Sequence, residues 1–177
     1  MRSIRDLFKK LPSDGDLRHK LRNFNMLPSR SKKAASVRDL ALSVGLDVRK
    51  VPLPRGMAGR LVQDPFSESG FGIEVNESHD VRSMRFTVLH EMGHYLLHMD
   101  RRDPLADPMH LNRSDEEFYF DLKAEREAND FADVLLFGDG SLQAAFSLYN
   151  GRLPDIAHYF GVTEKMVEVA MKKFRVK

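Results

Sequence analysis

The chain has no cysteine among its 177 residues. Disulfides, thiolate zinc knuckles and iron-sulfur clusters are therefore excluded, and any metal must be held by histidine or carboxylate side chains. Long apolar runs are missing too, since none approaches the roughly 20 residues that a membrane-spanning helix needs. The first ten residues lack the apolar core and small-residue cleavage site of a signal peptide. We therefore expect a cytoplasmic protein without membrane contact.

An excess of charge of one sign is also absent. The 28 basic and 26 acidic side chains leave a formal net charge of +2, which gives no argument for a nucleic-acid partner. Basic residues do gather between residues 18 and 33, a pattern more typical of a solvated face than of a binding arm. With 42% hydrophobic and 31% charged residues, the composition is that of a globular protein with one catalytic core.

The periodic segments predict an α+β fold in which helices dominate. Residues 1–31 are expected to form an N-terminal arm with a short helix and a linker. A core over residues 32–138 follows, in which a small antiparallel sheet packs on a long helix. Its helices and extended runs are expected at 32–44, 48–53, 61–62, 71–75, 84–98 and 114–138, with a turn-rich hairpin loop at 64–70.

Residues 139–177 are expected to form a C-terminal helical segment. Ala157, Gly161 and Val167 have the offsets of a helix-turn-helix, and Thr163 is placed to N-cap its second helix. Such a unit can enter a DNA major groove, or it can pack against the core and read no DNA. The second interpretation is favoured, because a pair of helices alone lacks a third supporting helix.

One segment carries a metal-binding pattern. Residues 90–94 read His-Glu-Met-Gly-His inside a proline-free stretch with helical apolar spacing. Side chains four residues apart lie one turn above each other, so His90 and His94 can bind the same ion. Glu91 lies about 100° around the helix from His90, where it borders the ion without binding it. The pattern predicts that Glu91 activates a zinc-bound water for peptide hydrolysis.

A third ligand must come from another segment, because a catalytic zinc normally has three protein ligands and one open position. The second long helix is the best source. When its residues are projected at about 100° each, three carboxylates fall near the apolar stripe: Glu127, Glu125 and Asp121. Glu127 is slightly favoured as the third ligand. One zinc ion per chain is the default, although another divalent ion that accepts two imidazoles and a carboxylate fits the same residues.

Two segments together resemble a known family. The run from Arg85 to His98 and the run Glu125-Arg126-Glu127-Ala128-Asn129-Asp130-Phe131-Ala132 are similar to the ImmA/IrrE family of zinc metallopeptidases. The similarity extends over about residues 32–137 and implies a zincin-like core. In that family the glutamate directly before Ala-Asn is the third ligand, which selects Glu127 here.

The resemblance also implies regulated cleavage of a repressor or antitoxin-like protein, in a phage, mobile-element or stress-response setting. The extended run 71–76 is a candidate edge for a substrate strand. His98 continues the four-residue spacing of the histidines, so it is a candidate fourth ligand or support for the ligands, although a histidine that only caps or packs at the helix end is the favoured interpretation. The other residues expected to support the ligands or to contact the substrate are Tyr95, Asn76, Asn129 and Glu125. Candidates for stabilising the oxyanion are Tyr95, His110, Tyr149 and His158.

A second class of function stays open at this point. In it the metal only stabilises the fold, and the protein is a non-catalytic transcriptional or toxin-antitoxin module. Its C-terminal helices or its basic N-terminal residues would bind DNA or a protein partner. DNA binding is the less favoured alternative. It would be recognised by an affinity for DNA that falls steeply as the salt concentration rises.

Overall fold

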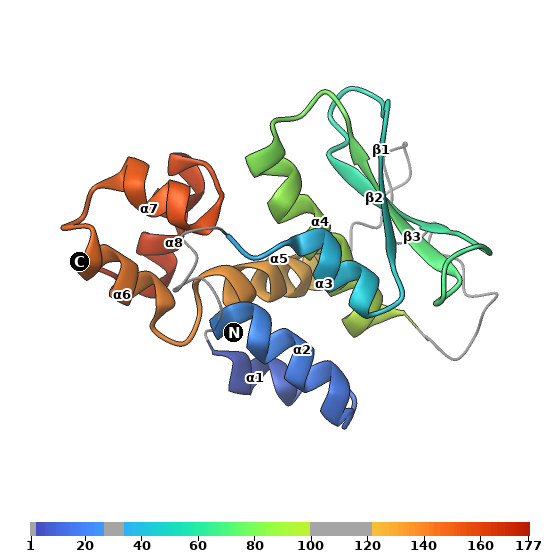
Figure 1. Cartoon of the computed structure of the whole chain (residues 1–177), viewed down its shortest axis with the longest axis horizontal. Coiled ribbons are helices and arrows are strands. Elements are labelled where there is room, and N and C mark those ends of the chain that lie inside the picture. Colours follow the sequence, from blue (N-terminus) through green and yellow to red (C-terminus); the bar gives the residue numbers. More distant parts are fainter. Residues whose placement is uncertain (1–2, 27–33, 100–121) are drawn as a thin grey trace. The chain divides into compact units, whose positions relative to one another are not determined.

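The computed structural model describes residues 3–26, 34–99 and 122–177. These residues form eight helices and three strands, which confirms the expected α+β class (Figure 1). In chain order the elements are α1 (Ile4–Phe8), α2 (Gly15–Met26), α3 (Val37–Ser43), β1 (Asp47–Val51), β2 (Gly59–Gln63), β3 (Phe71–Asn76), α4 (Val81–His98), α5 (Leu122–Phe137), α6 (Ser141–Leu148), α7 (Leu153–Phe160) and α8 (Glu164–Phe174).

Packing divides the chain into two compact units. The sheet unit comprises residues 37–129, and the helical unit comprises residues 1–36 together with 130–177. The division falls within α5, whereas the sequence-based division places its boundaries at residues 31 and 138. His90, His94 and both glutamates weighed as third ligand, Glu125 and Glu127, belong to the sheet unit.

The sheet has the strand order β1-β3-β2. β2 and β3 pair antiparallel, as the predicted hairpin requires, with Leu61 opposite Ile73. β1 and β3 pair parallel, with Val48 opposite Ile73, so the sheet is mixed and not the purely antiparallel sheet expected. The reason is that β3 returns from the hairpin between the two earlier strands. With a neighbour on each side, β3 is no edge strand, and the substrate edge predicted at residues 71–76 is wrong.

Helix α4 packs against β2 and β3. Asp80 caps its N-terminus, since the Asp80 Oδ1 accepts a hydrogen bond of 2.7 Å from the Arg82 backbone N–H. Leu89 and Met92 of the helix are 0% exposed, as are Leu61 and Ile73 of the sheet. Burial of this apolar side fixes the rotation of the helix, and with it the direction in which residues 90 and 94 point.

Strand β2 lies very close to helix α4 at Gly59. A Cβ atom on this residue would lie 2.4 Å from Thr87 Cγ2 and 2.9 Å from the Glu74 carbonyl oxygen. Because carbon atoms pack at about 3.5–4.0 Å, only glycine lets the strand lie this close to the helix. Thr87 precedes His90 by three residues, so this contact positions the part of the helix that carries His90 relative to β2.

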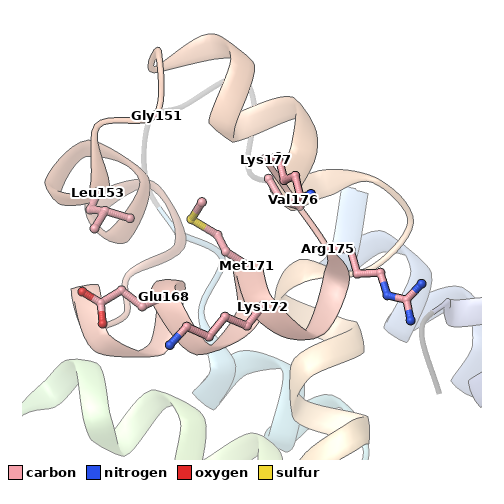
Figure 2. A pocket seen from close by; sticks show the side chains of 8 residues that line it. All are labelled: Gly151, Leu153, Glu168, Met171, Lys172, Arg175, Val176 and Lys177. Atoms are coloured by element: carbon pink, nitrogen blue, oxygen red, sulfur yellow. The ribbon is translucent and has the colours of Figure 1, made fainter.

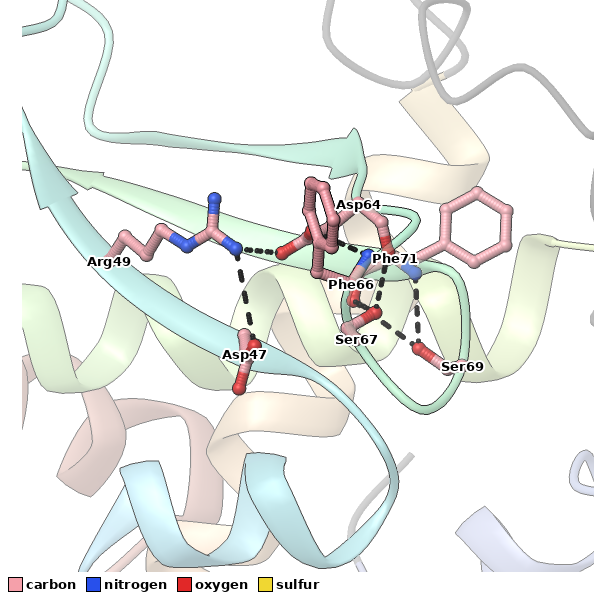
Figure 3. A network of polar contacts seen from close by, with 7 residues as sticks. All are labelled: Asp47, Arg49, Asp64, Phe66, Ser67, Ser69 and Phe71. Carbon is pink, nitrogen blue, oxygen red and sulfur yellow. Dashed lines mark hydrogen bonds and ion pairs between the residues drawn. The ribbon is translucent and has the colours of Figure 1, made fainter.

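Polar side chains hold the hairpin loop between β2 and β3 (Figure 3). The Asp64 carboxylate is buried and forms an ion pair with Arg49 of β1. Its other oxygen accepts a hydrogen bond of 3.1 Å from the Phe66 backbone N–H. The Ser67 hydroxyl donates to the Phe71 carbonyl oxygen at 2.7 Å. The loop confirms the turn predicted for residues 64–70, and Asp64 ties it to the far strand.

In the helical unit, two helices fill the stretch for which the sequence predicts one short helix and a linker. α1 and α2 bury Leu7 and Leu21 completely, both at 0% exposure. The Asn25 side-chain amide donates hydrogen bonds to the carbonyl oxygens of Val134 at 3.2 Å and Leu135 at 3.1 Å. These partners lie far along the chain, which is why local spacing did not reveal how firmly the N-terminal residues pack.

The C-terminal helices follow the predicted pattern. α7 ends at Phe160 and is followed by the cap residue Gly161, whose φ of 66° is left-handed. The Thr163 hydroxyl then accepts a hydrogen bond of 3.3 Å from the Met166 backbone N–H and caps α8. Among the described helices, none combines the length and the apolarity that a membrane crossing requires.

Candidate metal centre

Two histidines of α4 meet on one side of the helix. His90 and His94 are separated by one helical turn, and their Nε2 atoms lie 3.0 Å apart. His94 is only 1% exposed. The helix therefore presents two imidazole nitrogens to the same point, as the spacing of the motif predicts.

A carboxylate from α5 completes the group. Glu125 Oε2 lies 3.3 Å from His90 Nε2, and Glu125 Oε1 lies 3.2 Å from His94 Nε2. Within the described part of the chain, these three residues are the group of side chains arranged to hold a metal ion. In a tetrahedral zinc site with bonds of about 2.0–2.1 Å, two ligand atoms lie about 3.3–3.4 Å apart. The separations of 3.0–3.3 Å are therefore close to those expected of ligand atoms around one zinc ion.

The remaining ring nitrogens of both histidines have hydrogen-bond partners. His90 Nδ1 lies 3.1 Å from Asn129 Oδ1, which is an acceptor, so Nδ1 donates and the Nε2 lone pair is left for the shared point. His94 Nδ1 lies 3.3 Å from His98 Nδ1. Two lone pairs and a carboxylate facing one another need a cation between them, so the residues present fit a zinc ion.

Electrostatics at this point also favour a positive ion. Burial lowers the pKa of His90, but the carboxylates of Glu125 and Glu91 outweigh it and raise the pKa above its ordinary value. Hydrogen bonds from His90 and His94 hold the pKa of Glu125 far below its usual range. Both shifts show that the site favours positive charge on the histidines beside an ionised Glu125. A divalent metal can supply this charge in place of the protons.

Glu91 lies outside the three-residue group and is 6% exposed. Burial raises the pKa of its carboxyl group, and the nearby His90 and His94 and a hydrogen bond with the Leu61 backbone reduce this rise. The Leu61 N–H of β2 therefore holds the carboxylate in place. A carboxyl group with a raised pKa beside a metal centre is suited to accept and return a proton.

The structure places Glu125, and not Glu127, beside His90 and His94. Glu127 Oε2 instead lies 3.2 Å from His98 Nε2, one turn further along α4. Glu125, which the sequence also offered as a third ligand, therefore replaces Glu127 in the candidate metal group. The periodicity of one helix shows its apolar face, but it does not show how a second helix crosses it. Asp121 lies outside the described residues.

Of the other expected site residues, Asn129 contacts His90 and His98 contacts His94. Asn76 instead supports the chain between β1 and β2, because its side-chain amide donates hydrogen bonds to the carbonyl oxygens of Leu53 at 3.2 Å and Met57 at 2.8 Å. It is 3% exposed, so the expected contact with substrate does not fit its position.

The oxyanion candidates stay predictions. Tyr95 is 5% exposed, and its ring packs 5.8 Å from that of Phe71. Tyr149 and His158 belong to the helical unit, and His110 lies outside the described residues. Within the described residues, the Leu61 N–H beside Glu91 is a site group that the sequence did not reveal, since every residue except proline supplies a backbone N–H and no side-chain pattern marks it.

A cavity of about 620 Å³ lies in the helical unit, beside α8 (Figure 2). Leu153, Met171 and Val176 give it an apolar lining, and its polar side chains include Glu168 and Lys172. Its lining contains no histidine and only one carboxylate side chain. The cavity is therefore separate in its chemistry from the metal centre of the sheet unit.

Two imidazoles and a carboxylate around one point, with a buried glutamate beside them on a helix that packs on a small sheet, define a metal-dependent hydrolase. Residues 43–172 match the model of peptidase family M78, which is described as the IrrE N-terminal-like domain. The chain thus belongs to the ImmA/IrrE family of metallopeptidases, as the resemblance of its motifs predicts. A comparison with curated proteins found no match.

Proposed function

We propose that this protein is a zinc-dependent endopeptidase of the cytoplasm in which His90, His94 and Glu125 bind one zinc ion and Glu91 is the general base. The observation that carries the proposal is the convergence of two Nε2 atoms and the Glu125 carboxylate at separations of 3.0 to 3.3 Å. When bound in such a site, zinc polarises the scissile carbonyl group and lowers the pKa of a water molecule.

The protein's own residues then supply the proton transfers. Glu91 accepts a proton from the attacking water and returns it to the amine of the departing peptide. The Leu61 N–H fixes one side of the Glu91 carboxylate, so the other side is directed to the reacting groups. Burial raises the pKa of Glu91, which makes it a stronger base when ionised and a ready acid once protonated.

The substrate part of the proposal rests on family membership. The ImmA/IrrE resemblance implies cleavage of a transcriptional repressor or an antitoxin-like protein, in a phage or stress-response setting. A protein substrate follows from the peptidase family itself.

DNA binding by the C-terminal helices is less well supported. Lys173 of α8 forms ion pairs of 2.5 Å with Asp130 and Asp133, so part of the basic charge of the helix is already used. α8 also carries Glu164 and Glu168, which repel phosphates. We therefore propose no second function for this unit.

Incubation of the zinc-loaded protein with a proteome-derived peptide library tests the proposal. Mass spectrometry should detect new peptide termini with the wild type, and these should disappear with a chelator. Glu91→Gln should retain zinc but produce no new termini, whereas Glu77→Gln, a change at an exposed glutamate in the same unit, should cleave as the wild type does. Cleavage by Glu91→Gln would refute the role of the base, and cleavage with the chelator present would refute the metal mechanism.

A further inference from the structure

A chain of side chains leads away from the metal centre on the His94 side. His94 Nδ1 lies 3.3 Å from His98 Nδ1, and His98 Nε2 lies 3.2 Å from Glu127 Oε2. His98 is one turn after His94 in α4, and Glu127 belongs to α5. All three residues are in the sheet unit, and the side chains of His98 and Glu127 are 14% and 21% exposed.

The hydrogen bonds of this chain have only one consistent direction when Nε2 of His94 binds the metal. His94 must then carry its proton on Nδ1, where it donates to His98. His98 Nδ1 is therefore the acceptor, and its own proton lies on Nε2. That proton is donated to the Glu127 carboxylate, which has acceptor atoms only.

We infer that His98 and Glu127 are positioning residues, which hold His94 in the tautomer and orientation that metal binding requires. The inference rests on the proposed metal site, and it gives Glu127 a different task from that of a ligand. Partners of this kind fix a ligand histidine and strengthen its bond to the metal, and losing one costs about 10–100-fold in metal affinity.

The two ligand histidines differ in how they are held. His90 donates to the neutral side-chain amide of Asn129, whereas His94 is linked through His98 to the Glu127 carboxylate. A carboxylate at the end of the chain polarises His98 and, through it, His94. We expect the support of His94 to depend on both an acceptor at position 98 and a negative charge at position 127.

Competition with a chromophoric zinc chelator measures this dependence without reference to activity. His98→Leu removes the acceptor and should weaken zinc binding about 10–100-fold. His98→Asn keeps an acceptor near the place of Nδ1 and should recover most of the affinity. Glu127→Gln keeps the shape but removes the charge, and should cause a smaller loss. His19→Leu, at an exposed histidine, is the matched control and should bind as the wild type does.

Combining the variants shows whether His98 and Glu127 act through one series of hydrogen bonds or contribute independently to zinc affinity. If Glu127 acts only through His98, the double variant His98→Leu/Glu127→Gln should bind zinc no more weakly than His98→Leu alone. Multiplying losses would overturn the inference, as would a Glu127→Gln loss equal to that of Glu125→Gln. A wild type that binds no zinc would instead refute the proposed function itself.

Nitrogen NMR of the zinc-loaded wild type tests the proton positions without any substitution. His94 should carry its proton on Nδ1, and His98 should carry its proton on Nε2. A proton on Nδ1 of His98 would reverse the chain and overturn the inference, even if the His98→Leu variant fails to fold.

Discussion

Replacement of Gly59 by alanine tests whether the close approach of β2 to α4 is as tight as described. The new methyl carbon would lie 2.4 Å from Thr87 Cγ2, about 1.1 Å inside the shortest comfortable separation of two carbons. Thr87 is β-branched and lies within a helix, so its side chain has little freedom to move away. Overpacking of this kind costs about 1–3 kcal/mol, and we expect that loss in the free energy of unfolding of the metal-free protein.

A double-mutant cycle with Thr87→Ser identifies the clash. Serine removes Cγ2 but keeps the hydroxyl, which donates to the Ser83 carbonyl oxygen at 3.3 Å. Thr87→Ser alone should cost about 1 kcal/mol for a buried methyl group. In the Gly59→Ala background it should cost less than this or even stabilise, with a coupling energy of about 1–2 kcal/mol. The Glu74 carbonyl oxygen at 2.9 Å would keep part of the strain in the double variant.

Urea unfolding of the four proteins gives the coupling energy. Gly15→Ala is the control, because a Cβ atom there would meet nothing within 4 Å. It should change the stability by no more than a few tenths of a kcal/mol, or raise it. Effects of Gly59→Ala and Thr87→Ser that add within about 0.5 kcal/mol would refute the reasoning, since the two residues would then not be in contact.

Three further predictions concern charged residues. Glu125→Gln should abolish the stabilisation of the protein by zinc. For the wild type this stabilisation is about 2.7 kcal/mol at a free zinc concentration of 100 Kd, and urea unfolding measures it. Equal stabilisation of both proteins would show that Glu125 is not a ligand. Burial raises the pKa of the Glu91 carboxyl group in the folded, metal-free protein. The protonated Glu91 therefore contributes stability below its ordinary pKa of 4.5, and this contribution is lost as the pH rises through the raised pKa of the folded state. Glu91→Gln should therefore be more stable than the wild type at pH 8, with a difference that shrinks towards pH 4.5, and a difference independent of pH would contradict this. Lys173→Met should cost about 1–3 kcal/mol at pH 7, because it removes the cation that Asp130 and Asp133 share. The loss should diminish as the pH falls and these carboxylates gain protons, and a larger loss in acid would contradict the assigned ion pairs.

The sequence by itself determined the parts of the site that depend on local geometry. His90, Glu91 and His94 follow each other along one helix, and the helical repeat fixes their relative directions whatever the rest of the chain does. The turn at residues 64–70 and the Thr163 cap are local in the same sense, because their hydrogen bonds join residues only a few positions apart. Family membership also followed from short motifs, which the match over residues 43–172 confirms.

Tertiary structure alone decided which carboxylate faces the histidines. Glu125 and Glu127 are two residues apart on α5, about 200° around the helix and about 3 Å along it, and the crossing of α4 and α5 sends one to His90 and His94 and the other to His98. The central place of β3 and the contact of the Leu61 N–H with Glu91 were decided in the same way. Periodicity reports which face of an element is apolar, whereas the offset and angle between two elements arise only when their side chains pack together.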